Sequence, residues 1–317
     1  KSVYFTRQDI RYIVPIGVPA LYLQFQGDDP IKADSKAAFA TVILHPTPAM
    51  NVTAGVRYTD EHKDYTFFRK TFSGGVLTDI FGVGALDNGG KGTKAVYNGD
   101  RLDWRISVDY RFSPEVMAYA TVSTGFKGGG VTARPFTTTQ AINGAFKPET
   151  LTAYEFGVKT DLLDRRLRLN LSTFYNDYKS IQLPIGDCSL LDGFPVGKGP
   201  FPCAAIQNAG SGEMYGVELE MTASPVDGFD IDASLSMIDG KWKSIGRTVG
   251  NGIQLGDPIT SPKWKGSIGM QYRADLGDSG SLTPRFDLAY TGKQSLGALG
   301  RRAVGQSLDY NPSRAIA

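Results

Sequence analysis

Apolar and polar residues alternate strictly along one segment in the first half of the chain. Between Arg101 and Phe112 every second residue is apolar, often aromatic, and the residues between are charged or polar. Because successive side chains of a β-strand point to opposite faces, this strand would have one apolar face and one charged face. Its length matches the about 9–11 residues that cross a bilayer as a tilted strand. The pattern is typical of an outer-membrane barrel, with lipid on one side and a wet interior on the other.

The same period of two recurs along most of the chain. The alternating segments are 35–44, 50–59, 101–112, 116–126, 154–159, 167–172, 217–221, 231–236, 267–273 and 282–290. We therefore predict an all-β protein, a transmembrane antiparallel β-barrel with about ten strands in this chain.

The connections between these segments alternate in length. Short ones, with Pro, Gly or Asp at turn positions, fall at 45–48, 113–115, 162–165, 225–228 and 275–280; long ones fall at 67–99, 127–147, 183–207, 243–262 and from 292 onward. Long loops without periodicity are uncommon in compact soluble domains. Short periplasmic turns and long extracellular loops are the usual layout of an outer-membrane barrel. The alternation therefore also predicts the orientation of the strands.

Composition and charge pattern exclude two other classes of protein. The chain has 317 residues and a net charge of +2. No run approaches the about 18 apolar residues of a membrane helix, which excludes a helical membrane protein. Basic residues are interleaved with acidic ones, so no clustered basic face predicts a nucleic acid as partner.

The charged positions of the alternating segments are expected to face the barrel interior. An Arg or Lys in lipid near the midplane would cost about 2–4 kcal/mol. The expected interior residues are Arg57, Arg105, Asp109, Arg111, Glu155, Lys159, Arg168, Glu218 and Glu220. Inside a barrel they either line water, contact a plug or simply pair across strands, which is worth about 0.2–1 kcal/mol per pair.

Several segments together resemble one known family. They are SKAAFATVILHPTPAMNVTAGVRYTDEHKDY, RFSPEVMAYATVSTGFKGGG, KPETLTAYEFGVKTDLLDRRLRLNLSTFYNDYKSIQL and NAGSGEMYGVELEMTASP. The combination of 125–127 (Gly-Phe-Lys), 155–159 (Glu-x-Gly-x-Lys) and 215–218 (Tyr-Gly-Val-Glu) is similar to TonB-dependent receptors, the ligand-gated outer-membrane transporters of Gram-negative bacteria. The resemblance covers roughly 34–292.

The resemblance implies a barrel of 22 strands closed by an N-terminal plug and driven through a TonB box. Residues 1–317 are then expected to be part of the barrel domain, with the plug and the final strands outside this sequence. The implied function is active import of a scarce large solute, most simply an iron–siderophore complex, otherwise a cobalamin-like cofactor or an oligosaccharide. The implied partners are the TonB complex, outer-membrane lipid and a metal chelate.

Other functions remain open from the sequence. The main alternative is a passive porin without a plug; a surface glycan-binding β-protein is a third. An outer-membrane hydrolase built around His62 is a fourth, but no Ser or Asp partner is evident, so we expect neither an enzyme nor a cofactor. Between Asp60 and Lys70, the Tyr, Phe and Arg side chains either contact a ligand or anchor the rim. The run of three glycines from Gly128 is expected to be a flexible loop tip.

The two cysteines lie in one Gly/Pro-rich connection. We predict a disulfide between Cys188 and Cys203, which would close a short loop and stabilise it by about 3 kcal/mol. Such a bond implies an oxidising compartment.

Overall fold

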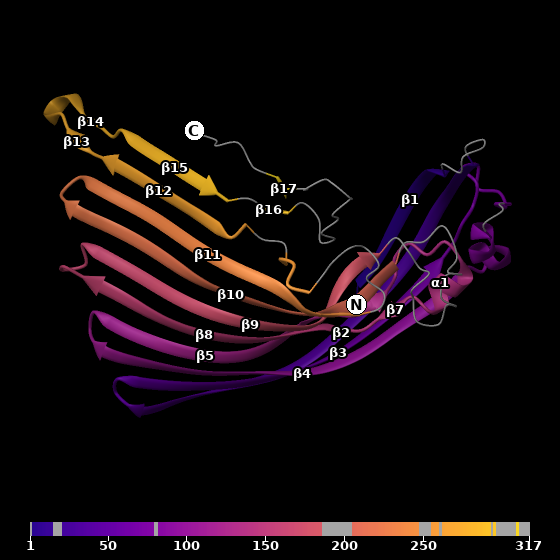
Figure 1. The fold of residues 1–317 in the computed structure, drawn as a ribbon, viewed down its shortest axis with the longest axis horizontal. Helices are drawn as coiled ribbons and strands as arrows, with labels where there is room; N and C mark the ends of the chain where they lie inside the picture. The colour runs from indigo at the N-terminus through magenta and orange to yellow at the C-terminus, as the bar shows by residue number, and fades with distance from the viewer. Residues whose placement is uncertain are drawn as a thin grey trace.

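The main feature of the structure is one large curved antiparallel sheet (Figure 1). The computed structural model describes residues 2–14, 21–78, 82–185, 205–246, 255–259, 262–292, 294–295 and 309–310. Within these residues the sheet has 11 strands in the order β1-β2-β3-β4-β5-β8-β9-β10-β11-β12-β15. Each strand therefore pairs with the next strand of this sheet along the chain, an up-and-down arrangement.

The sheet is built from long strands. They are β1 (Ser2–Val14), β2 (Leu21–Thr47), β3 (Met50–Phe67), β4 (Thr93–Ser113), β5 (Val116–Lys127), β8 (Glu149–Leu162), β9 (Leu167–Ile185), β10 (Ala205–Val226), β11 (Phe229–Ile245), β12 (Trp264–Tyr272) and β15 (Arg285–Thr291). Short strand pairs are β6 (Gly130–Val131) with β7 (Ala145–Phe146), β13 (Ala274–Asp275) with β14 (Ser281–Leu282), and β16 (Gln294–Ser295) with β17 (Asp309–Tyr310). The helical turns are η1 (Val83–Gly90), α1 (Thr138–Ile142) and η3 (Gly277–Ser279).

All ten predicted strands are present, and the all-β fold is confirmed. The eleventh, β1, was not predicted because the alternation in its sequence changes phase: Val3 and Phe5 occupy odd positions, Ile10 and Tyr12 even ones. Strands are also longer than predicted, since β4 begins at Thr93 and β10 at Ala205. Their added residues lie at one end of the sheet, where the long connections are, and there the simple alternation of apolar and polar residues is lost.

Tight turns join the strands at the other end. Between β8 and β9, the turn residues Leu163, Asp164 and Arg165 have positive φ angles of 54°, 53° and 67°. Between β10 and β11, Gly228 has a φ of 80°, and an added Cβ would come within 2.7 Å of the Arg273 carbonyl oxygen. We refer to this end of the sheet as the turn end and to the opposite end as the loop end.

The two faces of the sheet differ in chemistry. Strand register sets apolar side chains side by side in rows, such as Tyr154, Tyr175 and Tyr215, or Leu171, Leu219 and Leu235. Many of these large side chains are exposed, among them Leu102 at 59% and Phe156 at 51%. We call this side the apolar face. The opposite side, the polar face, carries the charged and hydroxyl residues of the same strands.

Buried side chains concentrate at the loop end. One cluster joins β3 and β4 to η1 and α1, a second lies between β9, β10 and β11, and a third surrounds Phe25. Within the described part of the chain, no helix is long and apolar enough to cross a membrane.

Candidate functional site: the polar face and its loop cap

The nine charged residues predicted to face the interior share the polar face. Unbroken pairing of β3 with β4, β4 with β5 and β5 with β8 places Arg57, Arg105 and Glu155 on one side of the sheet. The register of β8, β9 and β10 adds the rest: Asp109, Arg111, Lys159, Arg168, Glu218 and Glu220. Residues from five strands therefore form one continuous charged surface.

Part of this surface is tied together by short polar contacts. Tyr119 Oη donates to Glu155 Oε1 at 2.5 Å, and Lys159 Nζ lies 5.7 Å from the centre of the Tyr119 ring. Asn51 Nδ2 donates to Asp109 Oδ2 at 2.7 Å, and Arg168 Nε donates to Asp161 Oδ1 at 2.6 Å. These bonds hold the side chains in defined positions without burying them.

Two charged residues of the polar face are unpaired within the described part of the chain. Arg105 and Glu218 form no hydrogen bond or ion pair with another residue in the described ranges. Arg111, Lys159 and Arg168 surround a groove of about 340 Å³ near the turn end. Arg57 and Arg105 line a second groove, of about 450 Å³. Such charges can form ion pairs with another polar surface, and each exposed pair is worth about 0–1 kcal/mol.

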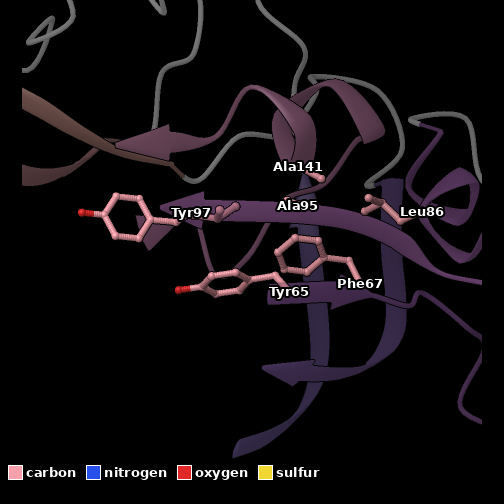
Figure 2. Packing of buried hydrophobic residues seen from close by; sticks show 7 residues of the cluster. Tyr65, Phe67, Leu86, Ala95, Tyr97 and Ala141 are labelled. Carbon is pink, nitrogen blue, oxygen red and sulfur yellow. The ribbon is translucent and has the colours of Figure 1, made fainter. Parts of the chain in front are cut away.

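A cap of loop segments packs over the polar face at the loop end. Figure 2 shows Tyr65 and Phe67 of β3 and Tyr97 of β4 beneath the segments that carry Leu86 and Ala141. Tyr65 and Phe67 stack with ring centres 6.0 Å apart. Burial raises the pKa of the Tyr65 and Tyr97 phenols. The long connections are thus partly packed against the sheet rather than free in solvent.

The expectation of a flexible glycine tip at 128–130 is wrong. Gly129 N–H donates to Tyr97 Oη at 3.2 Å, and its carbonyl accepts from Lys63 Nζ at 2.8 Å. A Cβ on Gly129 would lie 2.4 Å from both the Phe146 carbonyl oxygen and the Tyr97 ring. Glycine is required here because the backbone runs directly against the side chains of β4.

A buried ion pair fixes the first loop of the cap. Arg69 Nη1 donates to both carboxylate oxygens of Asp29 at 2.7 and 2.8 Å, and Arg69 Nη2 donates to the Pro135 carbonyl at 3.1 Å. The guanidinium also lies 5.1 Å from the Phe25 ring centre. Arg69 and Asp29 are 0% and 1% exposed. This arginine therefore joins β2, the loop after β3 and the loop after β5.

Two amide side chains fix the second loop. Gln182 Nε2 donates to the carbonyls of Gly128 at 3.0 Å and Lys147 at 3.1 Å. Asn208 Nδ2 donates to the Lys147 carbonyl at 2.8 Å, and its Oδ1 accepts from Lys147 N–H at 2.8 Å. Neither residue was singled out from the sequence; a single Gln or Asn in a strand carries no signal of the backbone groups that it meets.

The candidate ligand residues between Asp60 and Lys70 are mostly buried. Tyr65, Phe67 and Arg69 are 9%, 0% and 0% exposed. Their burial favours the interpretation that they anchor the rim rather than contact a ligand directly. The predicted disulfide partners Cys188 and Cys203 lie outside the described residues.

His62 lies on the apolar side of β3, near the loop end, and points away from the polar face. Its Nδ1 is 2.6 Å from Asn98 Oδ1 and its Nε2 is 3.2 Å from Asp64 Oδ2. The hydrogen bond to Asn98 and then that to Asp64 raise the pKa of the imidazole. No Ser joins these contacts, and the described residues contain no group of three or more His, Cys, Asp or Glu that could hold a metal ion.

Two named receptors are similar in sequence to parts of this chain. It is 26% identical over 196 residues to the pesticin receptor of Yersinia enterocolitica, a match that covers 59% of this chain and 23% of that receptor. It is 40% identical over 77 residues to the metal-pseudopaline receptor CntO of Pseudomonas aeruginosa, covering 24% of this chain and 10% of that protein. The matched regions thus cover less than a quarter of the length of these relatives.

Solved structures agree with the fold. The ferric yersiniabactin uptake receptor FyuA of Yersinia pestis aligns with a TM-score of 0.66 at 18% identity, over 88% of this chain and 38% of that structure. The alcaligin outer membrane receptor FauA of Bordetella pertussis aligns with a TM-score of 0.56 at 16% identity, over 86% of this chain and 41% of that one. Residues 3–314 match the family described as TonB dependent receptor-like, beta-barrel. The chain belongs to the TonB-dependent receptor β-barrel family.

Proposed function

We propose that this chain is part of the barrel wall of an outer-membrane receptor that binds a metal chelate and imports it with energy transmitted by TonB. The observation that carries the proposal is the combination of a charged polar face with loops that pack over its loop end. A chelate of the iron–siderophore kind is favoured because the similar proteins are named for such ligands: ferric yersiniabactin, alcaligin and metal-pseudopaline.

The apolar face is then the lipid-facing surface, and the polar face is the interior wall. We assign the nine charged residues of the polar face to contacts with the plug. Solvated ion pairs are individually weak, about 0–1 kcal/mol each. A plug that moves during transport needs such contacts, since they can break and form again. The open charges of Arg105 and Glu218 and the two grooves support this assignment.

Uptake by the full-length protein tests the proposal. It would be expressed in a Gram-negative strain that lacks its own ferric-chelate receptors and supplied with radioactive iron bound to yersiniabactin or to alcaligin. We expect accumulation of iron with at least one chelate, and loss of accumulation in a matched strain without TonB. Equal uptake in the two strains, together with a steady open conductance in planar bilayers, would instead establish a passive pore.

Variants of the polar face test the wall assignment. Arg105→Ala combined with Glu218→Ala should lower the rate of uptake several-fold while chelate binding at the cell surface is retained. Asp278→Ala, in the exposed turn between β13 and β14, is the matched control and should leave both unchanged. A double variant with the uptake rate of the parent would remove these two residues from the transport step.

A further inference from the structure

The turn end of the sheet, at the left of Figure 1, carries a groove where the polar face meets the turns. This mouth groove has a volume of about 640 Å³, and its lining includes Arg111 of β4, Arg168 of β9 and Arg165 of the turn between β8 and β9. Because a turn residue belongs to the lining, the groove extends beyond the strands and is accessible from the compartment that the turns face.

The three arginines keep most of their hydrogen-bond donors free. A guanidinium carries five N–H donors. Within the described residues, the Arg111 side chain donates only to the Pro114 carbonyl, at 3.4 Å, and that of Arg168 donates only to Asp161, at 2.6 Å. The Arg165 side chain forms no hydrogen bond or ion pair there. Free guanidinium donors bind carboxylates strongly, often through two parallel hydrogen bonds.

Two of the three carboxylates in the groove are already engaged. Asp161 accepts the hydrogen bond from Arg168, and Glu115 Oε2 accepts from the Ser113 hydroxyl at 2.8 Å. The third, Asp164, lies in the turn beside Arg165. The groove therefore retains cations that its own acidic side chains do not neutralise.

The positive charge is local to this part of the turn end. Segments 111–117 and 159–170 together contain five basic and three acidic side chains, a net charge of +2. The turn-end segments of β10 to β15, 224–232 and 271–287, contain two basic and six acidic side chains, a net charge of −4. The turn end thus has two halves of opposite charge, and the mouth groove lies in the positive half.

The turn that carries Arg165 is strained and firmly held. Residues 163–165 all have positive φ angles, a conformation that costs about 1–2 kcal/mol for each residue with a side chain. Backbone hydrogen bonds tie both sides of this turn to its neighbours: Asp161 N–H donates to the Glu115 carbonyl, and Ser224 N–H donates to the Arg166 carbonyl, each at 2.8 Å. Strain of this kind persists where the surrounding structure enforces it, and it is concentrated at functional sites.

The spacing of the arginines fits an extended peptide. Three strand spacings separate Arg111 on β4 from Arg168 on β9, which is about 14 Å. One carboxylate or phosphate group is too small to bridge them. An extended peptide rises about 3.3–3.4 Å per residue, so acidic side chains at every second position of a five-residue segment cover this distance. Leu163, 70% exposed in the same turn, offers an apolar contact to the same segment.

We propose that the mouth groove binds an extended acidic segment of a partner protein in the periplasm. The inference rests on the proposed function for the identity of that compartment, and it adds a second partner, besides the plug, for Arg111 and Arg168. Because the two halves of the turn end have opposite charge, a partner with its acidic segment over the groove is held in one orientation.

Fluorescence anisotropy of the full-length protein in detergent, with a labelled peptide of alternating Glu and Ser as the probe, tests the inference. We expect the parent to bind this peptide and not the peptide with Gln in place of Glu. Arg111→Gln with Arg165→Gln should weaken binding about fivefold or more, because two exposed ion pairs with the peptide are lost. Arg166→Gln with Arg273→Gln removes the same charge at the same end, outside the groove, and should bind like the parent.

Further arms separate the possible outcomes. Lysine at positions 111 and 165 keeps the charge and should recover binding, which shows that the loss in the Gln variant is not caused by misfolding. Sodium acetate at the same carboxylate concentration should not displace the peptide; full displacement would mean a small-anion site and would overturn the inference. Failure of the parent to bind, or equal binding by the two double variants, would also overturn it.

The peptide assay can fail independently of the proposed function. It uses neither a chelate nor TonB, so absence of peptide binding would leave the uptake test untouched. Absence of chelate uptake would equally leave a positive peptide result standing.

Discussion

Replacing Arg69 with Met should open the loop cap without unfolding the barrel. The substitution removes the two bonds to Asp29, at 2.7 and 2.8 Å, and the bond to the Pro135 carbonyl at 3.1 Å. It leaves the Asp29 carboxylate, which is 1% exposed, without the guanidinium that binds both of its oxygens. Breaking a buried pair from one side costs about 3–5 kcal/mol. The cost is local, because the pair connects loops and the end of β2 rather than the middle of the sheet.

Native-state hydrogen exchange of the full-length protein in detergent would measure this effect. The free energy of local opening should fall by about 3–5 kcal/mol for the amides of 68–78, which is more than about a hundredfold in exchange rate. Arg166→Met is the matched control: its partner Asp227 is 99% exposed, and the pair lies at a turn. That variant should change local stability by at most about 1 kcal/mol.

The pH dependence of the Arg69→Met variant provides an independent check. Burial raises the pKa of the Asp29 carboxyl, and the neighbouring Arg69 opposes that rise. Without the arginine the pKa rises further. The folded loop then binds a proton more tightly than the open loop, so the destabilisation should shrink as the pH falls through the raised pKa.

A second substitution decides whether the charge is responsible. Asp29→Asn in the Arg69→Met background keeps an oxygen that can accept from Phe68 N–H, 2.8 Å away in the parent protein. It should recover at least about 1 kcal/mol at neutral pH, because the buried charge that lost its bonds to Arg69 is gone. If the single variant exchanged like the parent, or the double variant were no better than the single, the reasoning from the buried pair would be refuted.

Three further substitutions test the cap and the two faces. Gly129→Ala should destabilise the second loop by about 1–3 kcal/mol because the methyl group has no space, whereas Gly125→Ala, with no atom within 4 Å, should be neutral in the same exchange measurement. Gln182→Ala should cost about 1–3 kcal/mol locally, seen as faster proteolysis of 128–147, because the carbonyls that it binds lose their donor. Val217→Lys should reduce the stability of the barrel in bilayers by about 2–4 kcal/mol, while Ser236→Lys on the polar face should fold normally; similar urea titration curves for the two would contradict the face assignment.

The strand layout could be predicted from the sequence because the barrel imposes a local rule. Where one face meets lipid and the other water, every second residue must be apolar, and segments such as 101–112 and 217–221 show this directly. The same rule placed the nine charged residues on one face before any register was known. It failed for β1, whose alternation changes phase, and it missed the first residues of β4 and β10.

The loop cap could not be predicted in the same way. Tyr65 and Phe67 continue the polar-face positions of β3, yet they are buried because η1 and α1 return over them. The three glycines at 128–130 suggest mobility, but Gly129 is held between Tyr97 and Phe146. These contacts join residues from different elements, such as Gly129 and Tyr97, which are 32 positions apart, and no local pattern encodes such a contact.

The sequence by itself determined the class of fold, the number of strands in the main sheet of the described residues to within one, the two faces of the sheet and the likeness to TonB-dependent receptors. The first three depend on whether each side chain meets lipid or water, and along a strand this alternates with a period of two residues. Only the tertiary structure decided which charged residues are paired and that Arg69 and Gln182 fix the cap. These depend on register and on loop packing, which bring together side chains from strands and loops far apart in the chain.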